Sequence, residues 1–339
     1  MTIENEGVVR LVVAMLGEVR GSRTLAMLTP MVPEHGAAPG EVARAQVAAA
    51  MNIALFAGLL DRVPSAADYV GEAVASGRRL CFDHGAIRTM ALARGNTGAL
   101  PRGELAFRRL LEPLGYEDAA THPLPALRMT GRAYRHRDFP ETIPQFFVSE
   151  LHVDQYDVEF GAVADRVFGT SRDPLDPDAV AALDHLAAGR SIPFDVAVAI
   201  LPTLVAAFGR HHAPCTIEDY ERLRSASAEA AWMATEGNAF NHATDRVVDV
   251  VALAEKQRAL GRPIKDEVEY SSTGRVRQTA FCADMVERRF ATASGDEQWM
   301  TVPGSFYEFI SRDVDPATGG LDLSFDSRNA TGIFQMTKQ

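Results

Sequence analysis

The sequence predicts an α+β protein in which two modules of β-α-β-β-β order form a half-open barrel. Residues 81–157 and residues 237–339 each begin with an apolar extended pattern, continue with a helical period and end with further extended runs. Residues 1–80 and residues 158–236 carry helical patterns instead. We therefore predict a helical N-terminal region, a first module, a helical insertion and a second module with a C-terminal tail, all in one integrated domain.

The N-terminal region is predicted to be helical for two reasons. Apolar residues near its start recur at helical spacing, at Val8, Leu11, Val12, Met15 and Leu16. After a turn-rich stretch, residues 41–63 are rich in Ala and Leu, which favour helix. Pro64 and Ser65 interrupt this pattern, and a short further helix is expected after them.

The first module opens with a strand over residues 80–92, which are mostly apolar. A helical period follows over residues 103–116 and ends at Gly115. Residues 125–139 contain two short extended runs, and we predict a turn between them at Gly131. Residues 144–156 are apolar and β-branched enough to form a buried strand.

The insertion between the modules carries two helix-start signals. Asp176 followed by Pro177 is typical of an N-cap with proline at the first helical position. Thr216 with Asp219 resembles a capping box, with Asp in place of the usual Glu. The pattern after Asp219 predicts one helix through residue 234.

The second module repeats the order of the first. A strand is predicted over residues 237–247 and an amphipathic helix over residues 247–261, ending at Gly261. Three further strands are predicted, over residues 268–274, 275–286 and 305–314. The turn-rich stretch after residue 314 predicts no regular element.

Composition narrows the class of partner. The chain has 339 residues with a net charge of −11, and such an acidic surface repels phosphate backbones and anionic lipid. No apolar run approaches the roughly 20 residues that span a bilayer, and the N-terminus lacks a signal-peptide pattern. The three cysteines form no CxxC, which fits a reducing compartment. We expect a cytoplasmic monomer or homodimer that acts on a small molecule, without nucleic acid or membrane partners.

The candidate chemistry starts with a histidine in the first strand of each module. Residues alternate faces along a strand, so His84 and Arg88 point the same way, about 13 Å apart along the strand. Phe82 is expected on that face. In the second module His242 takes the equivalent place, with Phe240 expected beside it. Because the first strands of paired modules commonly lie side by side, the two imidazoles could meet at one metal.

A third ligand is expected from the last strand. Glu308 lies there among aromatic and aliphatic residues, with Phe306 and Arg312 on its face. A buried carboxylate needs a partner, which could be a metal or Arg312. Two His and one carboxylate form the facial triad of non-haem Fe(II) oxygenases. The metal hypothesis requires the ligand atoms of all three residues to lie within about 5 Å of one another.

Four separated motifs resemble one known family. FDHGAIRT, GNAFNHATDRVVDV, RVRQTAFCAD and YEFISR, spread over roughly residues 50–312, are similar to the 2-oxoadipate dioxygenase/decarboxylase family, which has a vicinal-oxygen-chelate fold. The resemblance implies that His84, His242 and Glu308 bind the metal and that Arg88 binds a substrate carboxylate. It also makes Gln278 a candidate substrate contact, with Thr279 beside it in the RQT segment.

The resemblance implies a reaction as well. The expected cofactor is Fe(II), although the same ligands accept other divalent metals. A 2-oxo dicarboxylic acid, with 2-oxoadipate as the best candidate, would react with O2 to give 2-hydroxyglutarate and CO2, a step of lysine catabolism. Arg312 and Ser271 are further candidate substrate contacts. Apolar neighbours, namely Phe82, Phe240 and Phe306, would exclude water.

Other readings remain open at this stage. Either histidine could be a core residue satisfied by one hydrogen bond, and Arg88 could pair with Asp83. On the same fold, a glyoxalase-like isomerase would want a second carboxylate at the metal, for which Glu150 is the candidate. A ring-cleaving dioxygenase and a non-catalytic small-molecule binding protein are the remaining alternatives.

Overall fold

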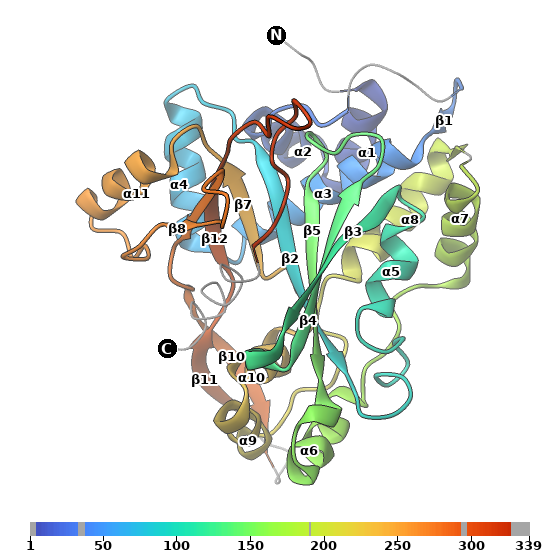
Figure 1. The fold of residues 1–339 in the computed structure, drawn as a ribbon. Coiled ribbons are helices and arrows are strands. Elements are labelled where there is room, and N and C mark those ends of the chain that lie inside the picture. The colour runs from blue at the N-terminus through green and yellow to red at the C-terminus, as the bar shows by residue number, and fades with distance from the viewer. Residues whose placement is uncertain (1–4, 33–37, 190, 293–296, 327–339) are drawn as a thin grey trace.

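The computed structural model describes residues 5–32, 38–189, 191–292 and 297–326. A curled, half-open sheet stands at the centre, with helices on both of its faces (Figure 1). The predicted α+β architecture is confirmed. The division into four ranges, as domain boundaries, stays a prediction.

The central sheet has eight strands, and each module supplies four neighbouring ones. Their order is β3 (Tyr116–Leu124), β4 (Met129–His136), β5 (Gln145–His152), β2 (Phe82–Ala91), β7 (His242–Arg246), β12 (Phe306–Arg312), β9 (Val276–Ala280) and β8 (Glu269–Tyr270). β2 and β7 pair antiparallel at the middle, while β2 with β5 and β7 with β12 are parallel. The first strands of the two modules therefore adjoin, as expected from the sequence.

Two hydrophobic layers cover the sheet. One layer packs the strands against α1 (Glu6–Leu16), α2 (Glu18–Met27), α3 (Arg44–Leu60), α4 (Pro64–Ala75), α5 (Leu105–Leu111), α7 (Pro177–Ala187), α8 (Phe194–Ala206) and α11 (Val250–Ala259). The other layer packs the opposite face against α6 (Val158–Phe168), α9 (Ile217–Ala226) and α10 (Ala228–Glu236). We call these the outer face and the inner face of the sheet.

Helix caps in the insertion follow the sequence, with one difference. Asp176 accepts a hydrogen bond from the Ala179 N–H, and Thr216 accepts one from the Asp219 N–H. The single helix predicted through residue 234 is wrong, because the chain breaks at Ser227 between α9 and α10. The Ser227 hydroxyl caps α10 by accepting from the Ala230 N–H.

The turn predicted at Gly131 is also wrong. The chain turns earlier, at Arg128, whose φ is 53°, and β4 runs through Gly131 without interruption. A Cβ atom at Gly131 would lie 2.3 Å from Cζ of Phe147 on the neighbouring strand, so any larger residue there would force this ring to shift. Strand β3, which precedes this turn, was not predicted at all.

Two further features lie outside the predicted pattern. β10 (Met285–Ala291) and β11 (Glu297–Pro303) form a separate antiparallel hairpin between β9 and β12. A short pair, β1 (Glu41–Val42) with β6 (Ile192–Pro193), joins the N-terminal region to the insertion. Two turns of 3₁₀ helix, Pro125–Leu127 and Val153–Gln155, flank β4 and β5.

No single helix in the described ranges is long and apolar enough to cross a membrane. Only α3 and α4 taken together have the necessary length and composition, and they are bent by 112° at their junction. The cytoplasmic location predicted from the sequence stays a prediction.

Candidate metal centre

The candidate site lies where the two modules meet, on the inner face of the sheet. β2 carries His84, β7 carries His242 and β12 carries Glu308. These three strands are neighbours in the sheet, and their register pairs His84 with Thr244 and Glu308 with Thr244. Strand pairing alone therefore brings together three side chains that are up to 224 residues apart in the sequence.

The three side chains converge on one point. One ligand atom from each of His84, His242 and Glu308 lies within 4.8 Å of the other two. The Nε2 atom of His242 is 3.3 Å from Oε2 of Glu308, and that of His84 is 3.8 Å from Oε1. The imidazole rings are nearly perpendicular, with centroids 5.6 Å apart. The distance condition set by the sequence analysis is met.

Burial makes this cluster costly without a cation. All three residues are at most 2% exposed. Burial and the nearby charge of Glu269 hold the pKa of Glu308 well above its usual range. Burial also holds the pKa of His242 well below its usual range, with His84 and Arg88 adding to the effect. A metal-free site therefore favours a protonated Glu308 and a neutral His242.

The donor set fits a divalent metal ion. Both nitrogens of His242 and both oxygens of Glu308 have no hydrogen-bond partner among the described residues. Buried polar atoms are normally satisfied, so the Nε2 atom of His242 and the Glu308 carboxylate, which face each other without another partner, indicate a missing ligand. Two imidazoles and one carboxylate are the donors that iron and its neighbours in the first transition series accept. In the described part of the chain, no other group of His, Cys, Asp or Glu has this arrangement.

Outer contacts orient His84. Its Nδ1 atom lies 2.8 Å from Oδ1 of Asp83, and the Thr244 hydroxyl is 3.1 Å from its Nε2. A register irregularity in β2 between Phe82 and His84 brings the Asp83 carboxylate to this position. Burial would raise the pKa of Asp83, but Arg312, His84 and Arg246 outweigh it and hold that pKa below its usual range. Asp83 is thus an anion, although the sequence analysis considered it only as a partner for Arg88.

Arg88 occupies the inner face near α10. Its side chain is fully buried, and its guanidinium lies 4.9 Å from the ring centroid of Trp232. Burial lowers the pKa of Arg88 to about 10, against the raising effect of Glu229. Arg88 therefore remains a cation at neutral pH. Its predicted role in binding a substrate carboxylate stays a prediction.

The other candidate substrate contacts are engaged by the protein. Gln278 is buried on β9 and donates to Glu269 at 3.3 Å. The Ser271 hydroxyl closes the turn between β8 and β9 by accepting from the Val276 N–H at 3.1 Å. Arg312 donates to Asp83, and its substrate role, like those of Gln278 and Ser271, stays a prediction.

The expected apolar surroundings are only partly correct. Phe306 does contact the site, since its ring centroid is 4.8 Å from that of His242. Phe82 and Phe240 belong instead to the hydrophobic cluster of the outer face, and this part of the prediction is wrong. The irregularity in β2 turns Phe82 away from the site, and Phe240 precedes β7 and lies against Gly85.

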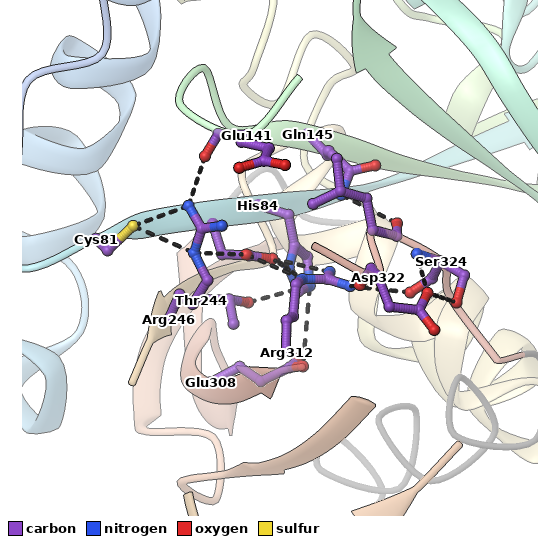
Figure 2. A network of polar contacts seen from close by, with 12 residues as sticks. Cys81, His84, Glu141, Gln145, Thr244, Arg246, Glu308, Arg312, Asp322 and Ser324 are labelled. Atoms are coloured by element: carbon purple, nitrogen blue, oxygen red, sulfur yellow. Dashed lines mark hydrogen bonds and ion pairs between the residues drawn. The ribbon is translucent and has the colours of Figure 1, made fainter. Parts of the chain in front are cut away.

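A residue in the unassigned tail completes the site. The C-terminal segment, red in Figure 1, passes in front of the central strands. There the Phe325 ring meets His84 edge-on at 4.9 Å and contacts Phe147 at 5.3 Å. Figure 2 shows Arg312 reaching from β12 to Asp322 and Ser324 on this segment, close to His84. No sequence signal pointed to Phe325, because it lies in a turn-rich stretch without periodicity.

A family model described as 2-oxoadipate dioxygenase/decarboxylase matches residues 46–323. That range contains His84, Arg88, His242 and Glu308. A search of curated proteins found no match.

Solved structures share the fold. A protein from Ralstonia eutropha JMP134, described as a glyoxalase superfamily protein, is 47% identical with a TM-score of 0.89, and the match covers 94% of this chain and 98% of that one. The hydroxyglutarate synthase from Oryza sativa in complex with 2-oxoadipate is 19% identical with a TM-score of 0.66, covering 92% and 97%. The hydroxyglutarate synthase from Pseudomonas putida in complex with 2-oxoadipate is 19% identical with a TM-score of 0.59, covering 89% and 75%. At 19% identity, the two synthases support the fold alone.

Proposed function

Because this chain belongs to the 2-oxoadipate dioxygenase/decarboxylase family, we propose that it is an Fe(II)-dependent enzyme that oxidatively decarboxylates a 2-oxo dicarboxylic acid. The proposed substrate is 2-oxoadipate, which with one O2 gives 2-hydroxyglutarate and CO2. This reaction balances without an external reductant, since the substrate supplies all the electrons. Its place in lysine catabolism is part of the same proposal.

The observation that carries the proposal is the buried group of His84, His242 and Glu308. Their ligand atoms lie within 4.8 Å of one another, and four of the polar atoms have no other partner among the described residues. Such a triad leaves coordination positions open for substrate and O2. When bound, Fe(II) would supply the redox chemistry, while the protein orients the reactants and excludes water.

The surrounding residues have separate proposed tasks. Arg88 would pair with a substrate carboxylate, most simply the distal one, through a charge-assisted bidentate contact. Its burial against Trp232 would strengthen that contact by removing competing water. Phe306 and Phe325 lie against the two histidines and would keep water from the reacting centre. Gln278 and Ser271 remain candidates for further substrate contacts.

The carboxylate considered for the isomerase alternative, Glu150, does not lie with the metal ligands. A glyoxalase-like isomerase would use a second carboxylate at the metal, and Glu150 was the candidate. The backbone N–H of Glu104 donates to the Glu150 carboxylate at 2.8 Å. On β5 Glu150 alternates with Phe147 and Leu151 of the inner layer, so it points to the outer face. This placement favours the oxygenase over the isomerase.

Oxygen uptake tests the proposal. Protein loaded with Fe(II) under argon would receive 2-oxoadipate and then air, with dioxygen loss and products followed together. We expect stoichiometric O2 uptake and formation of 2-hydroxyglutarate, both absent in His84→Ala. O2 uptake only with a different 2-oxo acid would change the proposed substrate but support the same class of reaction. Iron-loaded protein that consumes no O2 with any 2-oxo acid would refute the oxygenase.

A further inference from the structure

The two histidines of the candidate metal centre are held in different ways. His84 has a carboxylate on Nδ1, because Asp83 Oδ1 lies 2.8 Å away. His242 has no hydrogen-bond partner on either nitrogen among the described residues, and its ring rests against Phe306. One ligand is therefore oriented by a hydrogen bond and the other by packing alone.

The carboxylate that orients His84 is itself clamped. Asp83 has a side chain only 2% exposed and receives Nε and Nη2 of Arg312 at 3.0 and 2.9 Å. Arg246 adds a second cation, with Nε 3.4 Å from Oδ2. Two guanidinium groups thus fix the carboxylate in one position.

Arg312 also binds the C-terminal segment, which we define as residues 321–326. Its Nη1 donates to the carbonyl oxygens of Asp322 at 2.8 Å and Ser324 at 3.0 Å. Its guanidinium lies 5.3 Å from the ring centroid of Phe325, and that ring in turn contacts His84. The contacts therefore form a closed loop from His84 through Asp83 and Arg312 to the segment and back to His84.

Further contacts fix the segment independently of Arg312. Gln145 donates to the Leu323 carbonyl at 3.3 Å, and the Leu321 N–H donates to Glu141 at 3.1 Å. Gln145 and Glu141 lie in or just before β5, so the segment bridges the two modules over the metal centre. The family model ends at residue 323, so Phe325 lies beyond the matched range.

We propose that Asp83 and Arg312 are positioning residues for the metal ligand His84, and that Arg312 couples the orientation of His84 to the C-terminal segment. The inference rests on the metal site of the proposed function. An Asp83 carboxylate that accepts the Nδ1–H keeps the lone pair of His84 on Nε2, where a bound metal would replace the contact with the Thr244 hydroxyl at 3.1 Å. Because coupling between two sites is reciprocal, a metal that fixes His84 also stabilises the segment with Phe325 over it.

Metal affinity tests the positioning role without turnover. Co(II) would be titrated into the full-length apo-protein in competition with a chelator, and its visible absorption would report the coordination. We expect Asp83→Asn to weaken Co(II) binding by about 10–100-fold, the usual cost of losing an outer carboxylate. Asp83→Asn that binds Co(II) within about twofold of the unmodified protein would overturn the proposal.

Asp245→Asn is the matched control. Asp245 is equally buried on β7 but points to the outer face, where it bonds Tyr69 and Arg78. Its substitution should lower thermal stability while leaving the Co(II) affinity within about threefold. An equal loss of affinity in both variants would mean a general structural effect and would also overturn the proposal.

Arg312→Lys provides a second route if Asp83→Asn does not fold. Lys keeps a cation beside Asp83, but one ammonium cannot reach Asp83 and the two carbonyls together. We expect a threefold to tenfold loss of Co(II) affinity, and an unchanged affinity would count against the positioning role.

Hydrogen exchange tests the coupling. In the unmodified protein Co(II) should slow exchange of the amides of residues 321–326, and in Arg312→Lys this dependence should vanish. Glu141→Ala should speed exchange in both states and keep the dependence on Co(II), since it removes the acceptor of the Leu321 N–H, and Glu141 does not touch Asp83. If Co(II) does not change the exchange rates of these amides in the unmodified protein, the coupling is refuted.

These readouts separate the inference from the proposed function. A protein that binds Co(II) with the expected variant pattern but consumes no O2 would support the positioning role and refute the oxygenase. A protein that binds no divalent metal would overturn both.

Discussion

The Nε2 atom of His242 lies 3.3 Å from Oε2 of Glu308, on adjacent parallel strands, and neither atom has a hydrogen-bond partner among the described residues. A buried carboxylate or imidazole that has no hydrogen-bond partner destabilises a fold. A bound divalent cation would satisfy both atoms at once. The sheet therefore holds a costly arrangement that a metal ion would stabilise.

The first prediction separates stability from metal binding. Glu308→Gln removes a buried acid that must take up a proton on folding, so the apo-protein should gain free energy of unfolding at neutral pH. Co(II) affinity should fall by more than the roughly 100-fold that loss of an outer partner costs. Glu236→Gln is the control, because Glu236 is buried but paired with Arg288 at 2.6 Å and its loss should destabilise. Chemical denaturation with and without Co(II) measures both effects, and a destabilised apo Glu308→Gln would contradict the account.

The second prediction concerns how the stability of the metal-free protein and its metal affinity depend on pH. Burial, with Glu269, raises the pKa of Glu308 in the metal-free protein, so this carboxyl binds a proton that the unfolded chain has already lost above about pH 4.3. Its contribution to apo stability is full below that unfolded pKa and is lost as pH rises through the folded pKa. Metal binding must displace this proton, so affinity rises with pH over the same window. Burial lowers the pKa values of both histidines, so neither of them carries a proton that the metal must displace at neutral pH.

Calorimetry of Co(II) binding in buffers of different ionisation enthalpy counts the displaced protons. At a pH below the folded pKa of Glu308, about one proton should be released per metal bound. Proton release that is zero across the accessible range would mean that Glu308 is ionised before the metal arrives.

The third prediction concerns Arg88 and substrate choice. Arg88→Lys keeps the positive charge but loses the planar bidentate fork. With 2-oxoadipate, kcat/KM should fall by roughly 10–100-fold, equivalent to about 1.4–2.7 kcal/mol. With 2-oxohexanoate, which has the same length but no distal carboxylate, the fall should be less than about threefold. Equal losses of kcat/KM on both substrates would show that Arg88 does not bind the distal carboxylate.

The fourth prediction concerns the packing of β2 beside His84. A Cβ atom at Gly85 would lie 1.7 Å from Cζ of Phe240, so Gly85→Ala should cost about 1–3 kcal/mol of stability and displace His84. Gly58 in α3 is the control, since a Cβ there meets nothing within 4 Å and Ala should stabilise by about 0.5–1 kcal/mol. Thermal unfolding and Co(II) titration check both. A Gly85→Ala variant as stable as the unmodified protein would contradict the packing described.

Much of this architecture follows from local sequence pattern. The apolar strands around His84 and Glu308 and the helix ending at Gly261 are strong periodic signals, and their order implied two modules. Placing the first strands side by side then brought His84 and His242 together. The structure agrees, because β2 and β7 are neighbours in the eight-stranded sheet.

The remaining features depend on tertiary contacts. Gly131 resembles a turn residue in sequence, but the close approach of Phe147 explains it. The irregularity in β2 exchanges the expected positions of Phe82 and Asp83, and a strict two-residue period does not reveal it. Phe325 reaches His84 only because Arg312 and Gln145 hold an irregular segment, and such a contact has no local signature.

We propose that His84, His242 and Glu308 bind the iron at which a 2-oxo acid loses CO2 in the presence of O2. The most direct test follows release of labelled CO2 from 2-oxoadipate labelled at C1, in iron-loaded protein under air and under argon. We predict one CO2 released per O2 consumed, none under argon and none from Glu308→Gln. Release of CO2 under argon, or undiminished release by Glu308→Gln, would rule out an O2-dependent reaction at these three residues.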